Sequence, residues 1–287
     1  HEEILRYEEI LEIVRAATGL GFRKFRVTGG EPLVRRDAAR FLGDLAALPG
    51  VEQINLSTNG LRLAQVSRDL ATAGIRSVNV SLDAIDPAVY HRITGGKIAD
   101  VLAGIEAAQS EGVRQIKLNT VLMRGVNEHQ IWPLIRFASE NRLLLRFIEL
   151  MPVSLTEVLT EENFFPIAEV KRIIRQRTAM QADVRRHGNG PASYCHLPEF
   201  GISVGFIGAM TNLHFCDACN KMRLTADGKI RPCLGHHGEI DLMPSLRPRL
   251  DRDRLQALFL QALREKPAEH SFRQQYQPRR VMTAIGG

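Results

Sequence analysis

The sequence predicts an α/β fold for residues 1–152, because short β-rich apolar runs alternate there with stretches whose apolar residues recur at helical spacing. Glycines such as Gly74 and Gly112 stand where predicted helices should end. Strands and helices that alternate in this way form parallel βα units, arranged either as a barrel or as a doubly wound sheet. The predicted strands are residues 24–28, 53–57, 77–81, 115–121 and 144–150.

Residues 153–287 are expected to form an appended α+β region, because the regular alternation ends after Pro152. Helices are predicted over residues 167–176 and 252–264, and short strands over residues 182–187, 193–197 and 201–206. A hairpin that turns at Asp227-Gly228 follows these strands.

The charge and the cysteine content narrow the class of protein. The 287 residues carry a net charge of +6, only 6% of them are aromatic, and no basic run is interleaved with aromatic residues. This pattern favours a small polyanionic ligand over nucleic acid.

No apolar run is long enough to span a membrane and no signal peptide opens the chain, so we expect no membrane partner. Four unevenly placed cysteines do not form a disulfide framework, and we expect a reducing cytoplasm.

Three cysteines near the C-terminus, Cys216, Cys219 and Cys233, are the strongest chemical signal. The first two stand on one tight turn and the third follows the Asp227-Gly228 hairpin, so the three thiolates can converge on one metal centre. Three protein thiolates are one fewer than a closed four-thiolate site uses, which leaves a coordination position open for a substrate. The spacing therefore indicates a reactive centre more than a structural one.

Two other interpretations of these cysteines remain open. A Cys-x-x-Cys pair is also typical of zinc sites, in which His214, His236 or His237 would be the fourth ligand. The thiols could also be buried and inert, and ligand counting does not separate iron from zinc. The fourth cysteine, Cys195, lies in an alternating strand-like stretch, and we interpret it as a small buried apolar residue.

Small polar and charged residues recur at the ends of the predicted strands, where ligands meet parallel α/β folds. The paired glycines of Thr28-Gly29-Gly30-Glu31-Pro32 allow the backbone to approach a ligand closely, and Glu31 could accept a hydrogen bond from a ligand ammonium. For any single one of these residues, helix capping is an equally simple role. The other strand ends carry Ser57-Thr58-Asn59-Gly60, Ser81-Leu82-Asp83, Lys117 with Asn119, and Arg146 with Glu149 and Met151.

These motifs resemble those of a known family. Thr28-Gly29-Gly30-Glu31-Pro32 looks like the Gly-Gly-Glu-Pro motif of radical S-adenosylmethionine enzymes, in which the motif lines the methionine end of that cofactor. The run from Phe215 to Leu234 resembles the second-cluster region of the GTP 3′,8-cyclase family of molybdenum cofactor synthesis. The resemblance spans essentially the whole chain. It implies a partial (β/α) barrel of the radical S-adenosylmethionine type, with a second iron–sulfur site in the C-terminal α+β region.

The resemblance implies roles for individual residues. S-adenosylmethionine would be contacted by Gly30, Ser81 and Met151. GTP would be held by Arg26, Ser57, Lys117, Lys221, Met222 and Arg223. A 4Fe–4S cluster whose open iron meets the guanine would be bound by Cys216, Cys219 and Cys233. The cationic residues suit this ligand, because a triphosphate carries about four negative charges and favours Lys and Arg donors.

The reaction that the resemblance implies begins when a first 4Fe–4S cluster reduces S-adenosylmethionine to a 5′-deoxyadenosyl radical. That radical abstracts the ribose 3′-hydrogen of GTP, and the resulting carbon radical closes on guanine C8. A downstream pterin-forming enzyme of the same pathway would be a partner, and the assembly state is left open, with a homodimer as one option. The C-terminal Gly286-Gly287 pair fits insertion into the cavity, since glycine can thread a crowded site, and a frayed terminus is the alternative.

Two departures from the family pattern affect these expectations. The first-cluster motif, Cys-x3-Cys-x2-Cys, does not occur among the 287 residues. Because the chain starts at His1 within a helical pattern, we expect a preceding segment to carry this motif, with true loss of the motif as the alternative. The chain as given should then not cleave S-adenosylmethionine. In addition, Lys221 stands where the family usually has arginine, so a bidentate phosphate contact becomes a point-charge contact.

Two further functions from other classes remain open at this point. One is a zinc-stapled α/β protein that binds a nucleotide without radical chemistry. The other is a different radical S-adenosylmethionine enzyme with an auxiliary cluster, such as one that modifies peptides.

Overall fold

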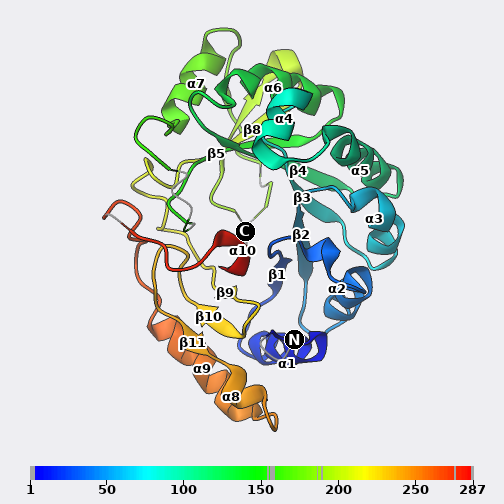
Figure 1. Cartoon of the computed structure of the whole chain (residues 1–287), viewed down its shortest axis with the longest axis vertical. Helices are drawn as coiled ribbons and strands as arrows, with labels where there is room; N and C mark the ends of the chain where they lie inside the picture. The colour runs from blue at the N-terminus through cyan, green and yellow to red at the C-terminus, as the bar shows by residue number, and fades with distance from the viewer. Residues whose placement is uncertain are drawn as a thin grey trace.

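The computed structural model describes residues 4–153, 155, 159–185, 187–188, 190–274 and 276–285. The C-terminal Gly286-Gly287 pair therefore lies outside the described residues. Figure 1 shows an arc of strands with helices on its outer side and the C-terminal region across the open side of the arc.

Eight strands form the main sheet, in the order β1-β2-β3-β4-β5-β8-β7-β6. The strands from β1 to β8 in this order run parallel, whereas β7 is antiparallel to β8 and β6 is antiparallel to β7. This arrangement confirms the predicted α/β class. The strands are β1 (Lys24–Val27), β2 (Gln53–Thr58), β3 (Ser77–Ser81), β4 (Gln115–Leu122), β5 (Leu144–Glu149), β6 (Gln181–Ala182), β7 (Ser193–Leu197) and β8 (Ile202–Ile207).

Helices cover the outer face of this sheet and form the main hydrophobic core with it (Figure 1). The outward-facing strand residues Val78, Val80, Leu118 and Leu145 are each 0% exposed. A mostly parallel, curved sheet with helices on its outer side is a partial (β/α) barrel. The helices are α1 (Tyr7–Gly19), α2 (Ala38–Ala46), α3 (Leu63–Thr72), α4 (Pro87–Thr94), α5 (Ile98–Ser110), α6 (Ile131–Glu140) and α7 (Ile167–Arg175).

The inner face of the arc is polar, although its strands are parallel. Ser57, Asn79 and Lys117 are neighbours in the pairing register of β2, β3 and β4, and Asn119 is paired with Arg146 on β5. Parallel strands that pack into hydrophobic cores on both faces have sequences that are almost continuously apolar. The alternation seen here therefore indicates an interior that faces a polar ligand.

The C-terminal region has a small core of its own, which it shares with α1. Leu5 and Ile13 pack there with Leu242, Leu255 and Phe259 from the other end of the chain. The elements of this region are β9 (Arg223–Leu224), β10 (Lys229–Arg231), β11 (Ile240–Asp241), α8 (Met243–Leu246), α9 (Arg252–Arg264) and α10 (Met282–Ile285).

The strands that follow residue 152 differ from the expected appended layer. β8, β7 and β6 extend the main sheet, and the separate sheet consists of β9, β10 and β11. The reason is the sequence of β8, which is buried at every position and pairs with β5 on one side and β7 on the other. β6 is also shorter than the strand predicted over residues 182–187. In the described part of the chain, no helix has the length and apolar character needed to cross a bilayer.

Glu9 connects α1 to the C-terminal region. Its carboxylate accepts hydrogen bonds from Arg247 Nε at 2.6 Å and from Arg247 Nη2 at 2.8 Å, and Glu9 is only 6% exposed. The hydrogen bonds from Arg247 lower the pKa of Glu9 to about 2.

We predict that acid removes the stabilisation that Glu9 provides. A carboxyl group whose pKa is lowered from 4.5 to about 2 stabilises the fold fully above pH 4.5 and loses this effect as the pH falls toward 2. The contribution to the free energy of unfolding is on the order of 2–3 kcal/mol. In urea unfolding at several pH values, Glu9→Gln should be less stable at pH 7 and should show a flatter pH dependence below pH 4.5. Glu8→Gln, at an exposed position of the same helix, is the control. Equal slopes for Glu9→Gln and the unchanged chain would contradict the prediction.

Candidate functional site

Three cationic side chains from three different strands face the space inside the arc. They are Arg26 on β1, Lys117 on β4 and Arg146 on β5. Lys117 is 5% exposed and Arg146 is 4% exposed, whereas Arg26 remains exposed to solvent within the barrel. Each occupies an inward register position, so the alternation of the strands places all three charges in one space.

These charges repel one another across the barrel interior. Burial, followed by the charges of Arg146 and Arg26, lowers the pKa of Lys117 to about 8. Burial lowers the pKa of Arg146 to about 10. The pKa of Arg26 is also lowered, because the protein around it removes part of its hydration although its side chain still reaches solvent. Among the described residues, no carboxylate contributes to these three shifts or pairs with these groups. Cations that are gathered without carboxylate partners form a binding site for an anion.

A chain of hydrogen bonds across β5, β3 and β2 orders this cationic surface. Arg146 Nη2 donates to Asn79 Oδ1 at 2.7 Å, and Asn79 Nδ2 donates to Ser57 Oγ at 3.1 Å. Lys117 Nζ donates to the backbone oxygen of His187. Tyr194 on β7 lies beside Arg146. Burial raises the pKa of the Tyr194 hydroxyl, and the charge of Arg146 opposes this rise.

Sequence reasoning assigned no ligand role to Asn79 or Tyr194, and it placed Arg146 only at the end of a strand. The signal for Asn79 is the polar residue at every second position of residues 77–81, which is unusual in a parallel strand. Local sequence does not mark Tyr194, because β7 reaches the site only through its antiparallel pairing with β8.

Glu31 connects the ends of β1 and β2. Its carboxylate accepts hydrogen bonds from Leu33 N at 3.0 Å, from Thr58 Oγ1 at 2.8 Å and from Asn59 N at 2.6 Å. The chain itself thus supplies three hydrogen-bond donors to the carboxylate that we expected to accept from a ligand ammonium. Its effect is to hold the Gly29-Gly30 backbone beside the end of β2.

The residues expected to contact S-adenosylmethionine stand at the C-terminal ends of three strands. Gly30 follows β1, Ser81 ends β3 and Met151 follows β5. Gly30 and Ser81 are exposed, and Met151 is half-buried. The three positions share one edge of the sheet because the strands that carry them are parallel. They are thus accessible to a ligand at the mouth of the barrel.

The three cysteines expected to bind a cluster come from two neighbouring segments. Cys219 N donates to Cys216 O at 2.9 Å, which closes the Cys-x-x-Cys turn, and Cys233 follows β10. Lys266 Nζ joins the two segments by donating to the backbone oxygens of Lys221 and Pro232, each at 2.8 Å. The same ammonium lies 3.9 Å from Cys219 Sγ.

The chemistry of this donor set suits a metal cluster. The cysteines are free and half-buried. Burial raises the pKa of Cys233, and the proximity of Cys216 and Cys219 contributes to that rise, so the three thiols are near enough to interact. Within the described ranges, however, no three His, Cys, Asp or Glu side chains are close enough together to hold a metal ion. The chain brings the thiols into one region without bringing them to coordination distance. Cys195 packs at the edge of the main core and is half-buried, so it is less enclosed than the buried residue that we expected.

Two of the histidines considered as zinc ligands have other partners. His214 Nδ1 lies 2.9 Å from Asp217 Oδ2, and the His214 side chain is 82% exposed. His237 stacks on Tyr276 with ring centroids 4.7 Å apart.

The positive charge of the barrel continues to the cysteine hairpin. Burial lowers the pKa of Arg223 to about 10, and the charge of Arg26 adds to this effect. Burial also lowers the pKa of Lys221. The charge of Arg26 lowers this pKa further, whereas Cys219 raises it. The charge of Arg26 thus acts on cations of both the barrel strands and the cysteine hairpin. Met222, in contrast, packs on the small C-terminal core.

We predict that removing the Lys117 charge stabilises the ligand-free protein. A lysine whose pKa is lowered from 10.5 to about 8 destabilises the fold while it is charged, and this cost disappears as the pH rises through that range. At pH 7, Lys117→Met should raise the free energy of unfolding by about 1–2 kcal/mol, part of the gain being offset by the lost hydrogen bond to His187. Urea unfolding at pH 7 and pH 10.5 measures the effect, with exposed Lys97→Met as the control. Destabilisation at both pH values would contradict the prediction.

Comparison with known proteins covers the whole chain. A family model described as Radical SAM superfamily matches residues 1–138, and one described as Molybdenum Cofactor Synthesis C matches residues 143–272. A protein named GTP 3′,8-cyclase from Moorella thermoacetica is 43% identical over 288 residues, which are 100% of this chain and 88% of that relative. A protein named GTP 3′,8-cyclase 1 from Pseudomonas aeruginosa is 40% identical, again over 100% of this chain and 88% of the relative.

A solved structure supports the fold. The crystal structure of Streptococcus suis SuiB bound to S-adenosylmethionine superposes with a TM-score of 0.57 at 16% identity, over 83% of this chain and 56% of that chain. The two family models account for both halves of the sequence, and the relatives match it from end to end. The chain therefore belongs to the GTP 3′,8-cyclase family of the radical S-adenosylmethionine superfamily.

Proposed function

We propose that this chain carries the site of a GTP 3′,8-cyclase of molybdenum cofactor synthesis. The observation that supports this most directly is a group of cations from the barrel strands and the cysteine hairpin, in which Arg26 interacts with Lys117 on one side and with Arg223 on the other. A guanine nucleoside triphosphate can use both groups of cations, because its phosphates can pair with one group and the O6 and N7 acceptors of its guanine can accept hydrogen bonds from the other.

The phosphates of GTP would lie against the barrel strands. Lys117, Arg146 and Arg26 supply charges that the described carboxylates do not neutralise, and Arg guanidinium groups bind phosphate oxygens in bidentate pairs. Asn79 holds the Arg146 guanidinium toward Ser57, so that a phosphate meets a side chain that is already oriented. Binding of the anion would remove the repulsion among the three cations.

The guanine would lie toward the hairpin, where Lys221, Met222 and Arg223 stand between the cysteines and β10. The reaction joins C3′ of the ribose to C8 of the guanine within one molecule. The chain must therefore hold the triphosphate and the base at two separate points, so that the two carbons meet in one geometry. The cations of the barrel strands and those of the hairpin would provide these two points.

A 4Fe–4S cluster and S-adenosylmethionine follow from membership of the radical S-adenosylmethionine superfamily. We assign one such cluster to Cys216, Cys219 and Cys233, where three thiolates would leave one iron open to the substrate. Gly30, Ser81 and Met151 would contact S-adenosylmethionine at the mouth of the barrel. Ligands for a further cluster are not among the 287 residues, since Cys195 is the remaining cysteine.

We retain the functional division at residue 152, with the S-adenosylmethionine contacts in residues 1–152 and the cluster in residues 153–287, although the main sheet crosses it. A reducing cytoplasm suits the free thiols. The cyclised nucleotide would be consumed by a pterin-forming enzyme, which is the class of partner that its chemistry requires.

We predict that Lys117→Ala and Arg146→Ala each weaken GTP binding by about tenfold or more, because both side chains belong to the barrel cations assigned to the phosphates and a hydrogen bond to a charged group is worth about 1.5–3 kcal/mol. Guanosine, which lacks the phosphates, should lose less than about threefold in affinity, and the GTP effect should shrink as salt is raised. Titration calorimetry with both ligands measures this, with exposed Lys97→Ala as the control. Equal losses for GTP and guanosine would mean that these side chains shape the fold and do not pair with phosphate.

We predict that the chain, reconstituted without oxygen, binds a single 4Fe–4S cluster, with about four irons and four sulfides per chain. Serine in place of Cys216, Cys219 or Cys233 should prevent assembly, whereas Cys195→Ser, whose thiol packs at the edge of the main core, should retain the cluster. Iron and sulfide analysis with the visible absorption spectrum measures the outcome. Twice this iron content, or stoichiometric zinc without sulfide, would contradict the assignment.

A further inference from the structure

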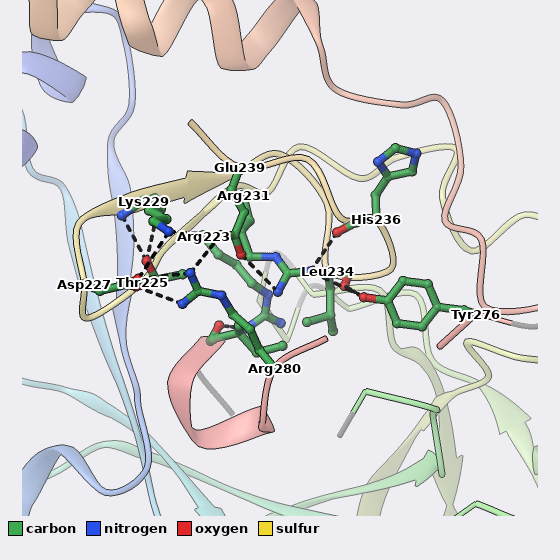
Figure 2. Close-up of polar contacts among 11 residues, drawn as sticks. Arg223, Thr225, Asp227, Lys229, Arg231, Leu234, His236, Glu239, Tyr276 and Arg280 are labelled. Carbon is green, nitrogen blue, oxygen red and sulfur yellow. Dashed lines mark hydrogen bonds and ion pairs between the residues drawn. The ribbon is translucent and has the colours of Figure 1, made fainter. Parts of the chain in front are cut away.

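The last described segment of the chain, residues 276–285, lies along the hairpin of β9 and β10 (Figure 2); we call this segment the tail. At its start, the Tyr276 ring stacks on His237, and Tyr276 OH donates to Leu234 O at 3.5 Å. Arg231 Nη2 lies 3.4 Å from the same hydroxyl and 2.7 Å from His236 O. The tail thus begins against the segment that carries Cys233.

Arg280 joins the middle of the tail to two acidic residues of the C-terminal region (Figure 2). Arg280 Nη1 and Nη2 donate to the two carboxylate oxygens of Asp227, each at 2.9 Å, and Nη2 also donates to Glu239 Oε2 at 2.8 Å. The side chains of Arg280 and Glu239 are 22% and 19% exposed, so these ion pairs are partly protected from solvent. Paired parallel hydrogen bonds of this kind fix the orientation of the guanidinium as well as its position.

The end of the tail, α10, lies inside the arc next to the proposed ligand sites (Figure 1). A Cβ on Gly30 would lie 3.4 Å from the Cβ of Thr283, so α10 packs against the Gly29-Gly30 backbone. Ile285 is 2% exposed, and its backbone oxygen accepts a hydrogen bond from Arg223 Nη1 at 3.4 Å. One short helix therefore contacts both the proposed S-adenosylmethionine loop and a proposed GTP residue.

A helix as short as α10 does not hold its place by its own hydrogen bonds, because isolated helices of this length are not stable in water. Its position must come from tertiary contacts that offset the conformational entropy lost on ordering the segment. Asp227 stands at the turn of the hairpin that also carries Arg223. The ion pairs of Arg280 thus connect the tail to the element that presents Arg223.

We propose that Arg280 is a positioning residue, whose fork of ion pairs to Asp227 and Glu239 sets the place of α10 against Gly30 and Arg223. The part of this inference that concerns GTP rests on the proposed function. The part that concerns the order of the tail does not, because it follows from the contacts of Arg280 alone.

Hydrogen exchange of the full chain tests the order of the tail. Arg280→Met should speed exchange of the α10 amides by about tenfold, the effect expected when a charged hydrogen-bond pair is lost. Arg279→Met is the matched control, because Arg279 is the adjacent, exposed arginine. Arg280→Lys keeps the charge but loses the fork, and should give an intermediate rate. Unchanged α10 exchange in Arg280→Met, or an equal increase in Arg279→Met, overturns the proposal.

A double-mutant cycle separates the ion pair from a general loss of stability. Asp227→Asn should also speed α10 exchange, and the double variant with Arg280→Met should be no faster than Arg280→Met alone, because both changes break the same contact. Exchange in the main sheet, for example in β4, should stay unchanged in all variants. Additive effects, or faster exchange throughout the sheet, overturn the proposed connection.

GTP binding tests the consequence for the site. Arg280→Met should raise the GTP dissociation constant by about threefold or more, since Arg223 loses its ordered neighbour, whereas Arg279→Met should not. Arg280→Lys should recover part of the loss. A loosened tail with unchanged GTP affinity overturns the positioning role. If the unchanged chain does not bind GTP, the proposed function fails, while the exchange comparison still decides whether Arg280 orders the tail.

Discussion

Positive charge without carboxylate partners, held inside the barrel, is the constraint on which the rest of this structure depends. Lys117 and Arg146 are almost fully buried, and burial lowers the pKa of both. Like charges in this setting oppose folding. The strands keep them together because their outer faces pack into an apolar core through residues such as Val78 and Leu118. The free energy of that core offsets the repulsion, and an anionic ligand would relieve it.

The acidic residues near the site explain why the cations stay available. Glu31 accepts hydrogen bonds from the backbone of Leu33 and Asn59. Glu149 is 0% exposed and its carboxylate accepts from the backbone of Ile167, Met210 and Thr211. Asp183 receives hydrogen bonds from Arg185, Ser203 and His187, which hold its pKa well below the usual range although burial opposes this. Hydrogen bonds within the chain thus occupy all three carboxylates. In the described structure, none of them pairs with the barrel cations.

The C-terminal region completes the site from the open side of the arc. Its core packs on α1, and Glu9 and Arg247 join the first helix to this distant part of the chain. The hairpin therefore occupies a defined place relative to the strands. Because Arg26 interacts with cations of both the barrel and the hairpin, the two parts form one electrostatic environment. A substrate with a charged end and a neutral end can be held between them.

The sequence by itself determined the βα alternation, the strand ends that carry Gly30, Ser81 and Met151, and the three-thiol motif, because each of these is encoded within a short stretch of residues. The family followed from the same local motifs. Only the tertiary structure decided that β6 to β8 extend the main sheet, that Asn79 orients Arg146, and that Glu31 binds the chain itself. These contacts join residues that are distant in the sequence. Their partners are chosen by packing and strand register, which no local pattern specifies.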